Sequence, residues 1–210
     1  MYRRYLKRPL DVILSVISLI VLSPLFLLVS IAIKLDSKGP VFFKQKRVGK
    51  GKTLFDIYKF RTMTADAPHD VPTNDLRKAS LYITKVGKVL RVTSVDELPQ
   101  LINILKGEMS LIGPRPALWN QDDLIDWRDH FGANDVLPGL SGWAQVNGRD
   151  YLSLDLEKKA RRDGEYAHHI SFWFDVKCFL LTCVKVVNRQ GIVEEHDPDP
   201  LEEKAGEESK

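Results

Sequence analysis

Asp96 and Glu97 stand side by side in the stretch TSVDELPQ and are the residues of this chain best suited to do chemistry. One interpretation is structural: Ser94 and Glu97 have the S-x-x-E spacing of a capping box, and a helix dipole favours a negative charge at Asp96. That helix would contain Pro99, whose ring removes a backbone hydrogen bond. If Pro99 instead opens the helix, both acids lie on the preceding loop and can face a ligand.

Basic residues around the acid pair indicate which ligand it could face. Arg91 precedes Asp96 by five residues, and Arg115 stands between two prolines in GPRP, which hold its backbone stiffly. A guanidinium held in this way suits phosphate, because its planar fork matches two phosphate oxygens. Further positive charge comes from Lys59, Arg61 and Arg149. Acids beside phosphates are typical of divalent-cation sites, so we expect Mg²⁺ with Asp96 and Glu97 as its ligands.

Several familiar functional classes lack their sequence signals here. The chain contains no GxGxxG, GxxxxGK[ST], GxSxG or HExxH motif, which argues against the common nucleotide-binding folds, serine hydrolases and zincins. Nucleic acid is not the expected partner of the basic residues. Many of them flank an apolar segment, where anionic membrane lipids are the simpler partner.

The acid pair belongs to a chain with an apolar N-terminal segment. Val12 to Ile33 carry no charge, and a straight helix over them would be about 33 Å long, enough to span a bilayer core. Lysines and arginines flank both ends, whereas the positive-inside rule predicts asymmetry for a spanning helix. Pro24 predicts a kink, and Ser23 could satisfy the carbonyl that the proline frees. We favour a re-entrant helix-break-helix hairpin with both flanks cytoplasmic; a kinked single span is the alternative.

The remaining elements give an α/β fold dominated by helices, with amphipathic helices at the membrane interface. Two strands joined at residues 49–52 predict a small β-hairpin, and LPGLSGWAQVNGRD is typical of a loop with a short strand. The apolar run from Ile170 to Val187 is either a core helix or an interfacial one. The predicted strands are Val41–Arg47 and Thr53–Arg61, and the predicted helices are Leu98–Lys106, Trp119–His130 and Leu154–Tyr166.

Length and charge complete the predicted organisation. The 210 residues suffice for one domain with a core, and the formal net charge is +3. The stretch EEHDPDPLEEKAGEESK is acidic and rich in turn formers, which predicts disorder. We therefore expect a re-entrant membrane anchor at 1–36, a catalytic domain at 37–193 and a disordered acidic tail at 194–210.

From about Arg8 to Val193 the chain resembles the bacterial sugar transferases, the small monotopic polyprenol-phosphate phosphoglycosyl transferases. The resemblance rests on the anchor with Ser23-Pro24 and on the blocks GPVFFKQKRVG, IYKFRTM, TSVDELPQLINILKGEMSLIGPRP and PGLSGWAQVNGR. It implies an enzyme at the cytoplasmic face of the bacterial inner membrane. This family transfers a phospho-sugar from a UDP-sugar to undecaprenyl phosphate and releases UMP, as the first membrane step of glycoconjugate assembly.

The resemblance also implies roles for individual residues. Asp96 corresponds to a nucleophile that forms an aspartyl-phosphosugar intermediate, and Glu97 to a helper in metal binding or proton handling. Phosphate binding falls to Arg91 and Arg115, with Mg²⁺ offsetting charge on the diphosphate. The residues expected to contact the nucleotide or sugar are Gln145, Asn147 and Arg149.

Two other functions remain compatible with the residues alone. A membrane-bound phosphohydrolase could use the same acids, metal and arginines with water as the acceptor. A non-catalytic adaptor could bind anionic lipids through the basic flanks, and Asp96 would then only cap a helix. The sequence does not specify the sugar or the pathway. It also leaves the oligomeric state open, because the run Ile170–Val187 could serve a homodimer contact as well as a membrane.

Overall fold

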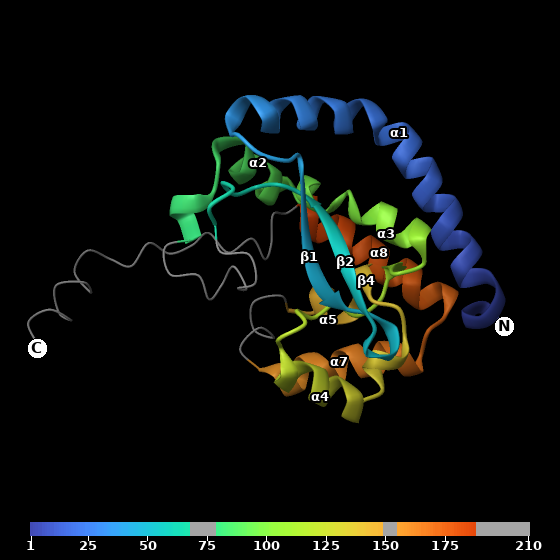
Figure 1. Cartoon of the computed structure of the whole chain (residues 1–210). Coiled ribbons are helices and arrows are strands. Elements are labelled where there is room, and N and C mark those ends of the chain that lie inside the picture. The colour runs from blue at the N-terminus through green and yellow to red at the C-terminus, as the bar shows by residue number, and fades with distance from the viewer. Residues whose placement is uncertain (68–78, 149–154, 188–210) are drawn as a thin grey trace, which may run out of the picture.

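The computed structural model describes residues 1–67, 79–148 and 155–187 (Figure 1). It is a helix-dominated α/β structure, as predicted, and it contains one long N-terminal apolar helix and two small sheets, of which only the β-hairpin was expected. The helices are α1 Lys7–Asp36, α2 Lys85–Thr93, α3 Gln100–Lys106, α4 Asp122–His130, α5 Trp143–Val146, α7 Leu156–His168 and α8 Phe172–Val187. The strands are β1 Phe42–Val48, β2 Leu54–Phe60, β3 Ser110–Ile112 and β4 Gly139–Ser141. The acidic tail at 194–210 lies outside the described residues.

The predicted β-hairpin is confirmed, to within about a residue at each end. β1 and β2 pair antiparallel, with Phe42 opposite Phe60 and Val48 opposite Leu54. Alternation along β2 places Phe55, Ile57 and Lys59 on one face. The two apolar residues of that face are buried against α3, in a core cluster with Leu101, Ile104 and Met109.

α1 is one continuous helix through Pro24, bent into two arms (Figure 1). A proline at this position removes the hydrogen bond to the carbonyl of Ile20 and favours a bend. The Ser23 hydroxyl donates to that carbonyl at 2.8 Å, as expected from the sequence. The expected interruption between two half-helices is therefore wrong for this structure: the helix bends without breaking, because the serine replaces the lost hydrogen bond.

Both arms of α1 pack against the same body of the protein. On the first arm the buried Asp11 accepts a hydrogen bond from the Ser110 hydroxyl at 2.7 Å. On the second arm Val29 and Ile33 are buried in a cluster with Phe60 and Leu90. Most of the remaining apolar side chains of α1 are exposed, and by length and composition the segment Tyr2–Asp36 could cross a membrane.

The sequence left two uses open for the run Ile170–Val187, a core helix or an interfacial one, and α8 has features of both. One side of α8 is in the core: Cys178 is buried in a cluster with Ile112, Trp143 and Tyr166. The other side exposes large apolar side chains, namely Phe172, Trp173, Phe179, Leu180 and Val184. Both sides of α8 are therefore apolar, and only one of them is covered by protein.

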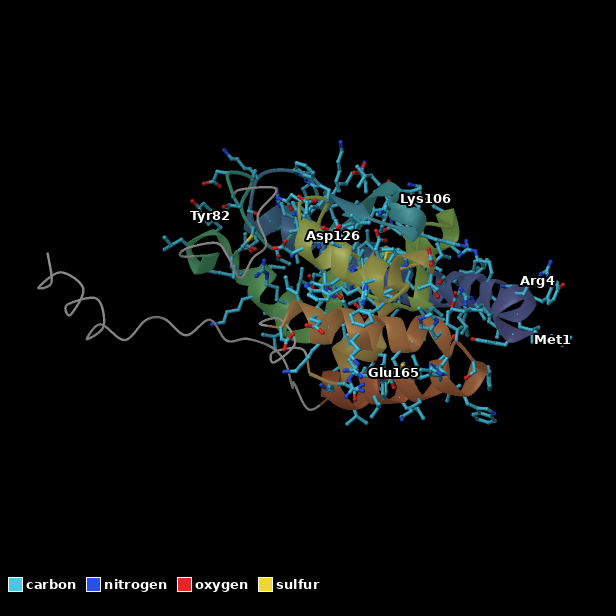
Figure 2. All side chains as sticks on the ribbon, turned by 90° about the horizontal axis from the view of Figure 1, so that it is seen from below. Met1, Arg4, Tyr82, Lys106, Asp126 and Glu165 are labelled. Atoms are coloured by element: carbon cyan, nitrogen blue, oxygen red, sulfur yellow. The ribbon has the colours of Figure 1, made fainter. Side chains whose placement is uncertain are left out.

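α4 and α7 pack together on the side of the hairpin away from the second arm of α1 (Figure 1). Their contact buries Leu124 and Ala160 in one cluster with Val48 and Ala117. Viewed from below, Asp126 on α4 and Glu165 on α7 lie toward the viewer (Figure 2). The C-terminal end of β1, at Val48, is therefore covered by two helices that lie away from the second arm of α1.

Candidate functional site

The acid pair lies in a short 3₁₀ turn, Val95–Glu97, between α2 and α3. Ser94 ends α2 in the left-handed conformation, with φ of 57°, and its side chain makes no capping hydrogen bond. Pro99 stands directly before the first residue of α3. The capping-box interpretation is therefore wrong. The alternative is confirmed in that both acids precede α3, although this helix begins one residue after Pro99 rather than at it.

Glu97 is held by two cations. Arg115 donates from Nη2 to Oε1 at 2.6 Å and from Nη1 to Oε2 at 3.3 Å, and the Lys59 ammonium donates to Oε1 at 2.8 Å. Burial alone would raise the pKa of Glu97, but the charges and hydrogen bonds of Arg115 and Lys59 hold it well below its usual range. Glu97 is consequently a carboxylate at neutral pH that fixes the positions of two cations.

Asp96 has a different environment although it is the next residue. Only 9% of Asp96 is exposed, and its carboxylate has no hydrogen-bond partner among the described residues. Burial raises the pKa of Asp96 above its ordinary value, and the charge of Glu97 adds to the rise, whereas Lys59 and Arg91 oppose it. A poorly solvated carboxylate with free oxygens beside cations is suited to attack a phosphorus atom or to bind a metal-phosphate complex.

Arg115 is positioned by a close crossing of two backbone segments. Gly113 donates to the Ser141 carbonyl at 2.8 Å, and Gly139 donates to the Pro114 carbonyl at 2.8 Å. A Cβ atom on Gly142 would lie 2.0 Å from the Gly113 carbonyl oxygen, so only glycine fits there. The β3–β4 pairing, which the sequence alone did not indicate, thus places the GPRP stretch against the acid pair.

The structure joins three of the predicted cations to the acids and separates a fourth. Lys59 and Arg115 contact Glu97, and the charge of Arg91 acts on Asp96 while its Nε donates to Thr62 Oγ1 at 3.0 Å. The Arg61 guanidinium instead donates to the carbonyls of residues 37 and 38, at 2.8 and 2.7 Å, at the end of α1. Its hydrogen bonds therefore hold the anchor in place, and a substrate contact for Arg61 stays a prediction.

The residues expected at the nucleotide or sugar lie on or after α5. Asn147, which directly follows α5, donates from Nδ2 to the carbonyl of Trp143 at 2.8 Å. The Gln145 side-chain oxygen is buried and has no hydrogen-bond partner within the described part of the chain. Neither of the two hydrogen-bonds to the acid pair. Arg149 lies outside the described residues, so its predicted role is not tested.

Two basic residues near the site were not predicted from the sequence. Arg47 lies at the far end of β1, and its Nη1 donates to the Pro116 carbonyl at 3.2 Å. Lys159 lies on α7, and the charges of Arg47 and Arg115 both act on it. Strand alternation could have identified Arg47, which shares a face with Lys59. No sequence signal connects Lys159 with the acid pair, because α7 reaches the hairpin only through tertiary packing.

The residues present fit a magnesium ion only in combination with a phosphate ligand. Among the described residues, no group of three histidine, cysteine or carboxylate side chains could hold a metal ion. Both Glu97 oxygens are already engaged by cations, so Asp96 offers the free carboxylate. One carboxylate plus substrate phosphate oxygens is a donor set that Mg²⁺ commonly takes in proteins.

Comparisons with known proteins show the family that this chain resembles in sequence. A sequence model of the family described as bacterial sugar transferase matches residues 2–189. The UDP-N-acetylgalactosamine-undecaprenyl-phosphate N-acetylgalactosaminephosphotransferase of Aeromonas hydrophila is 42% identical over 175 residues, which are 82% of this chain and 41% of that protein. The UDP-glucose:undecaprenyl-phosphate glucose-1-phosphate transferase of Escherichia coli (strain K12) is 40% identical over 193 residues, 87% of this chain and 40% of that protein.

A third relative has a length similar to that of this chain. The uncharacterized sugar transferase EpsL of Bacillus subtilis (strain 168) is 40% identical over 187 residues, which are 89% of this chain and 90% of that protein. The chain thus spans about two fifths of the length of the Aeromonas and Escherichia relatives and about nine tenths of EpsL. The similarity includes both the apolar helix and the body that carries the acid pair.

Proposed function

The chain belongs to the bacterial sugar transferase family, and we propose that it transfers a phospho-sugar from a UDP-sugar to undecaprenyl phosphate with release of UMP. The observation that carries this proposal is the buried Asp96 carboxylate, which has free oxygens and is surrounded by the charges of Lys59, Arg91 and Arg115. The relatives named for this reaction support the choice of donor and acceptor. Residues 37–193 are the proposed catalytic domain.

In the proposed first step an Asp96 oxygen attacks the phosphorus next to the sugar. The new bond joins Asp96 to the phospho-sugar, and the bond between that phosphorus and the bridging oxygen breaks, so that UMP leaves with the electron pair. In the second step a phosphate oxygen of undecaprenyl phosphate attacks the same phosphorus and releases Asp96 as a free carboxylate. Covalent catalysis of this kind divides one difficult transfer into two easier steps.

The neighbouring residues supply positioning and charge. Lys59, Arg91 and Arg115 hold phosphate oxygens and stabilise the negative charge that develops in each step. Because Glu97 stays ionised between two cations, we assign it to fixing Lys59 and Arg115 rather than to proton transfer. Mg²⁺, bound by Asp96 and the substrate phosphates, would neutralise charge on the diphosphate.

The acceptor is a membrane lipid, and the exposed apolar surfaces of α1 and α8 suit a site at the membrane surface. We propose that α1 is re-entrant, entering and leaving the bilayer on the cytoplasmic side. In support, Lys7 forms an ion pair with Asp175 at 2.7 Å, while the other end of α1 is held by Arg61. Both ends of the helix therefore contact one body, which a straight membrane span would separate. The basic flanks are the proposed contacts for anionic lipids.

Labelling of single cysteines tests the topology. We expect Arg4→Cys and Lys38→Cys, each in a Cys183→Ser background, to react with a membrane-impermeant maleimide in inside-out vesicles and not in spheroplasts. Both positions are exposed, and the remaining Cys178 is buried. Cys178 alone serves as the unlabelled control. Opposite accessibility of the two positions would show that α1 spans the bilayer and would contradict the re-entrant arrangement.

UMP release tests the proposed reaction. Purified protein in nanodiscs with Mg²⁺ and undecaprenyl phosphate should release UMP from at least one of a panel of UDP-sugars. The panel is needed because relatives that act with N-acetylgalactosamine and with glucose are 42% and 40% identical to this chain, so similarity does not specify the sugar. Sugar phosphate formed without the lipid acceptor would instead indicate a phosphohydrolase. No UMP from any donor would favour a lipid-binding adaptor.

A further inference from the structure

A row of cations continues along the hairpin beyond the acid pair. Lys59 is opposite Phe43 in the β1–β2 register, and Arg47 lies four residues further along β1. Residues at this spacing share a face of the sheet, and the backbones at Lys59 and Arg47 are about 13 Å apart along the strand. Arg115, which binds Glu97 together with Lys59, is also a charged neighbour of Arg47. Phe55 and Ile57 fill this face between the two, so the positive charge extends from Lys59 to Arg47 by way of Arg115 rather than along the strand.

Arg47 has no acidic partner among the described residues. Its Nη1 donates to the Pro116 carbonyl at 3.2 Å and its Nη2 to the Gln45 side-chain oxygen at 2.6 Å, both neutral groups. Its Nε is buried and lacks a hydrogen-bond partner. Burial and the charge of Arg115 together lower the pKa of Arg47 to about 10. The guanidinium is thus charged at neutral pH and only partly satisfied.

Lys159 approaches the same place from α7. The next residue, Ala160, is buried in a cluster with Val48 and Ala117, each close in sequence to Arg47 or Arg115. Within the part of the chain that the structure describes, the Lys159 ammonium makes no hydrogen bond or ion pair. Asp163, the acid whose charge acts on Lys159, is already bound by Arg128 through two hydrogen bonds of 2.9 and 2.5 Å.

We propose that Arg47 and Lys159, with Arg115 beside both, form a second anion site that binds the phosphate which UMP retains. The proposal rests on the proposed function, and it assigns the two ends of the substrate diphosphate to different groups. The phosphate that carries the sugar lies at Asp96 and Lys59, and the nucleotide phosphate lies at Arg47 and Lys159. Unpaired, partly buried cations are costly without an anion, which is why a ligand must complete this cluster.

A phosphate could come from the nucleotide or from the lipid, and the position of the cluster favours the nucleotide. α7 and α4 lie on the side of the hairpin away from the second arm of α1 (Figure 1), and Asp126 and Glu165 mark that side in the view from below (Figure 2). The lipid phosphate is fixed at the membrane surface where the apolar faces of α1 and α8 insert. A water-soluble nucleotide reaches the outer side without crossing that surface.

The test is UMP binding by the full-length protein in nanodiscs, measured by calorimetry for the wild type and Lys159→Met. We expect Lys159→Met to weaken UMP binding about tenfold to a hundredfold, because a charged hydrogen bond to phosphate is lost. Binding of uridine, which lacks the phosphate, should be unchanged. The thermal midpoint should stay equal or rise, because an unpaired buried charge is removed. Loss of UMP binding together with a lower thermal midpoint would show that Lys159 supports the fold rather than the phosphate, and would overturn this assignment.

Lys158 supplies a matched control on the same helix. It is 74% exposed and paired with Asp155 at 2.8 Å, so Lys158→Met should leave UMP binding as in the wild type. Equal UMP affinity in wild type and Lys159→Met would overturn the second site and leave the proposed function standing. A raised KM for undecaprenyl phosphate with unchanged UMP affinity would assign the cluster to the lipid instead. A wild-type protein that binds no UMP would overturn the proposed function as well.

The pH dependence of UMP affinity is a second, independent test of the role of Lys159. Burial, followed by the charge of Arg128, lowers the pKa of Lys159 to about 8, and the other charges that face it are Arg115, Arg47 and the paired Asp163. Because only the protonated ammonium binds phosphate, UMP affinity should be highest below pH 8 and fall as the pH rises to 9. The UMP phosphate is already a dianion above pH 7 and adds no change there. Lys159→Arg should bind UMP without this fall, because arginine stays charged; a fall retained in Lys159→Arg would contradict the assignment.

Discussion

Asp96→Asn is expected to lower UMP release by at least about a thousandfold, because an amide cannot form the acyl-phosphate bond. The variant should fold as well as the wild type. Burial already raises the pKa of Asp96, so a neutral amide of the same shape costs little in that environment. The measurement is UMP formed per unit time with the donor sugar identified from the panel. Undiminished release by the variant would remove Asp96 from the chemistry.

Glu97→Gln is the informative comparison for Asp96→Asn. It removes the charge that pairs with Arg115 and Lys59, so it should lower the thermal midpoint as well as the rate. Asp96→Asn should lower the rate alone. Intact-protein mass measured with UDP-sugar but no lipid acceptor adds a direct test, because only proteins that retain Asp96 should gain the mass of the phospho-sugar. An adduct of equal yield on Asp96→Asn would contradict the proposed nucleophile.

Asp163→Asn is expected to destabilise the protein by about 3–5 kcal/mol, because it leaves the Arg128 guanidinium buried without its counter-ion. The two side chains are 1% and 4% exposed, and both hydrogen bonds from Arg128 end on the same Asp163 oxygen. For a chain of this size the loss corresponds to a drop in thermal midpoint of about 6–20 °C. The change would also loosen the contact between α4 and α7 and thereby weaken UMP binding at Lys159.

A surface ion pair on the same helix is the control for Asp163→Asn. Arg162 and Glu165 pair at 3.0 Å with 46% and 43% of their side chains exposed, so Arg162→Gln should cost less than about 1 kcal/mol. Replacing both buried partners, as in Arg128→Met with Asp163→Leu, should recover much of the loss, because no uncompensated charge remains. Equal midpoints for Asp163→Asn and Arg162→Gln would show that the buried pair contributes no more than the exposed one.

The local chemistry of the site could be read from the sequence. Pro99 cannot continue a preceding helix without losing a hydrogen bond, so the alternative with Asp96 and Glu97 ahead of α3 followed from backbone sterics. The β-hairpin followed from the alternation of its strands and a glycine turn. The hydrogen bond from the Ser23 hydroxyl to the carbonyl that Pro24 leaves unpaired followed from the backbone geometry around the proline. Each of these features depends on residues within a few positions of one another.

Long-range partners could not be read in the same way. Arg61 and Arg115 are the same residue type and were both predicted at the substrate, yet Arg61 binds the carbonyls at the end of α1 and Arg115 binds Glu97. Which arginine meets an acid depends on how α1, the hairpin and the GPRP segment pack, and neither periodicity nor composition encodes that choice. The β3–β4 pairing was missed for the same reason. The helix over residues 85–93 was missed although it has a local signal, because the Thr84 hydroxyl caps it by accepting from the Gly87 N–H.

By itself the sequence determined the acid pair, the stiff arginine, the apolar anchor and the family to which they belong. Only the tertiary structure decided that Glu97 is the ionised partner of two cations while Asp96 is the buried carboxylate with free oxygens. Only it brought Lys159 of α7 toward Arg47 of β1. The physical reason is that local steric rules set the conformation of short segments, whereas the charge state and partner of a side chain depend on which distant segments exclude water around it.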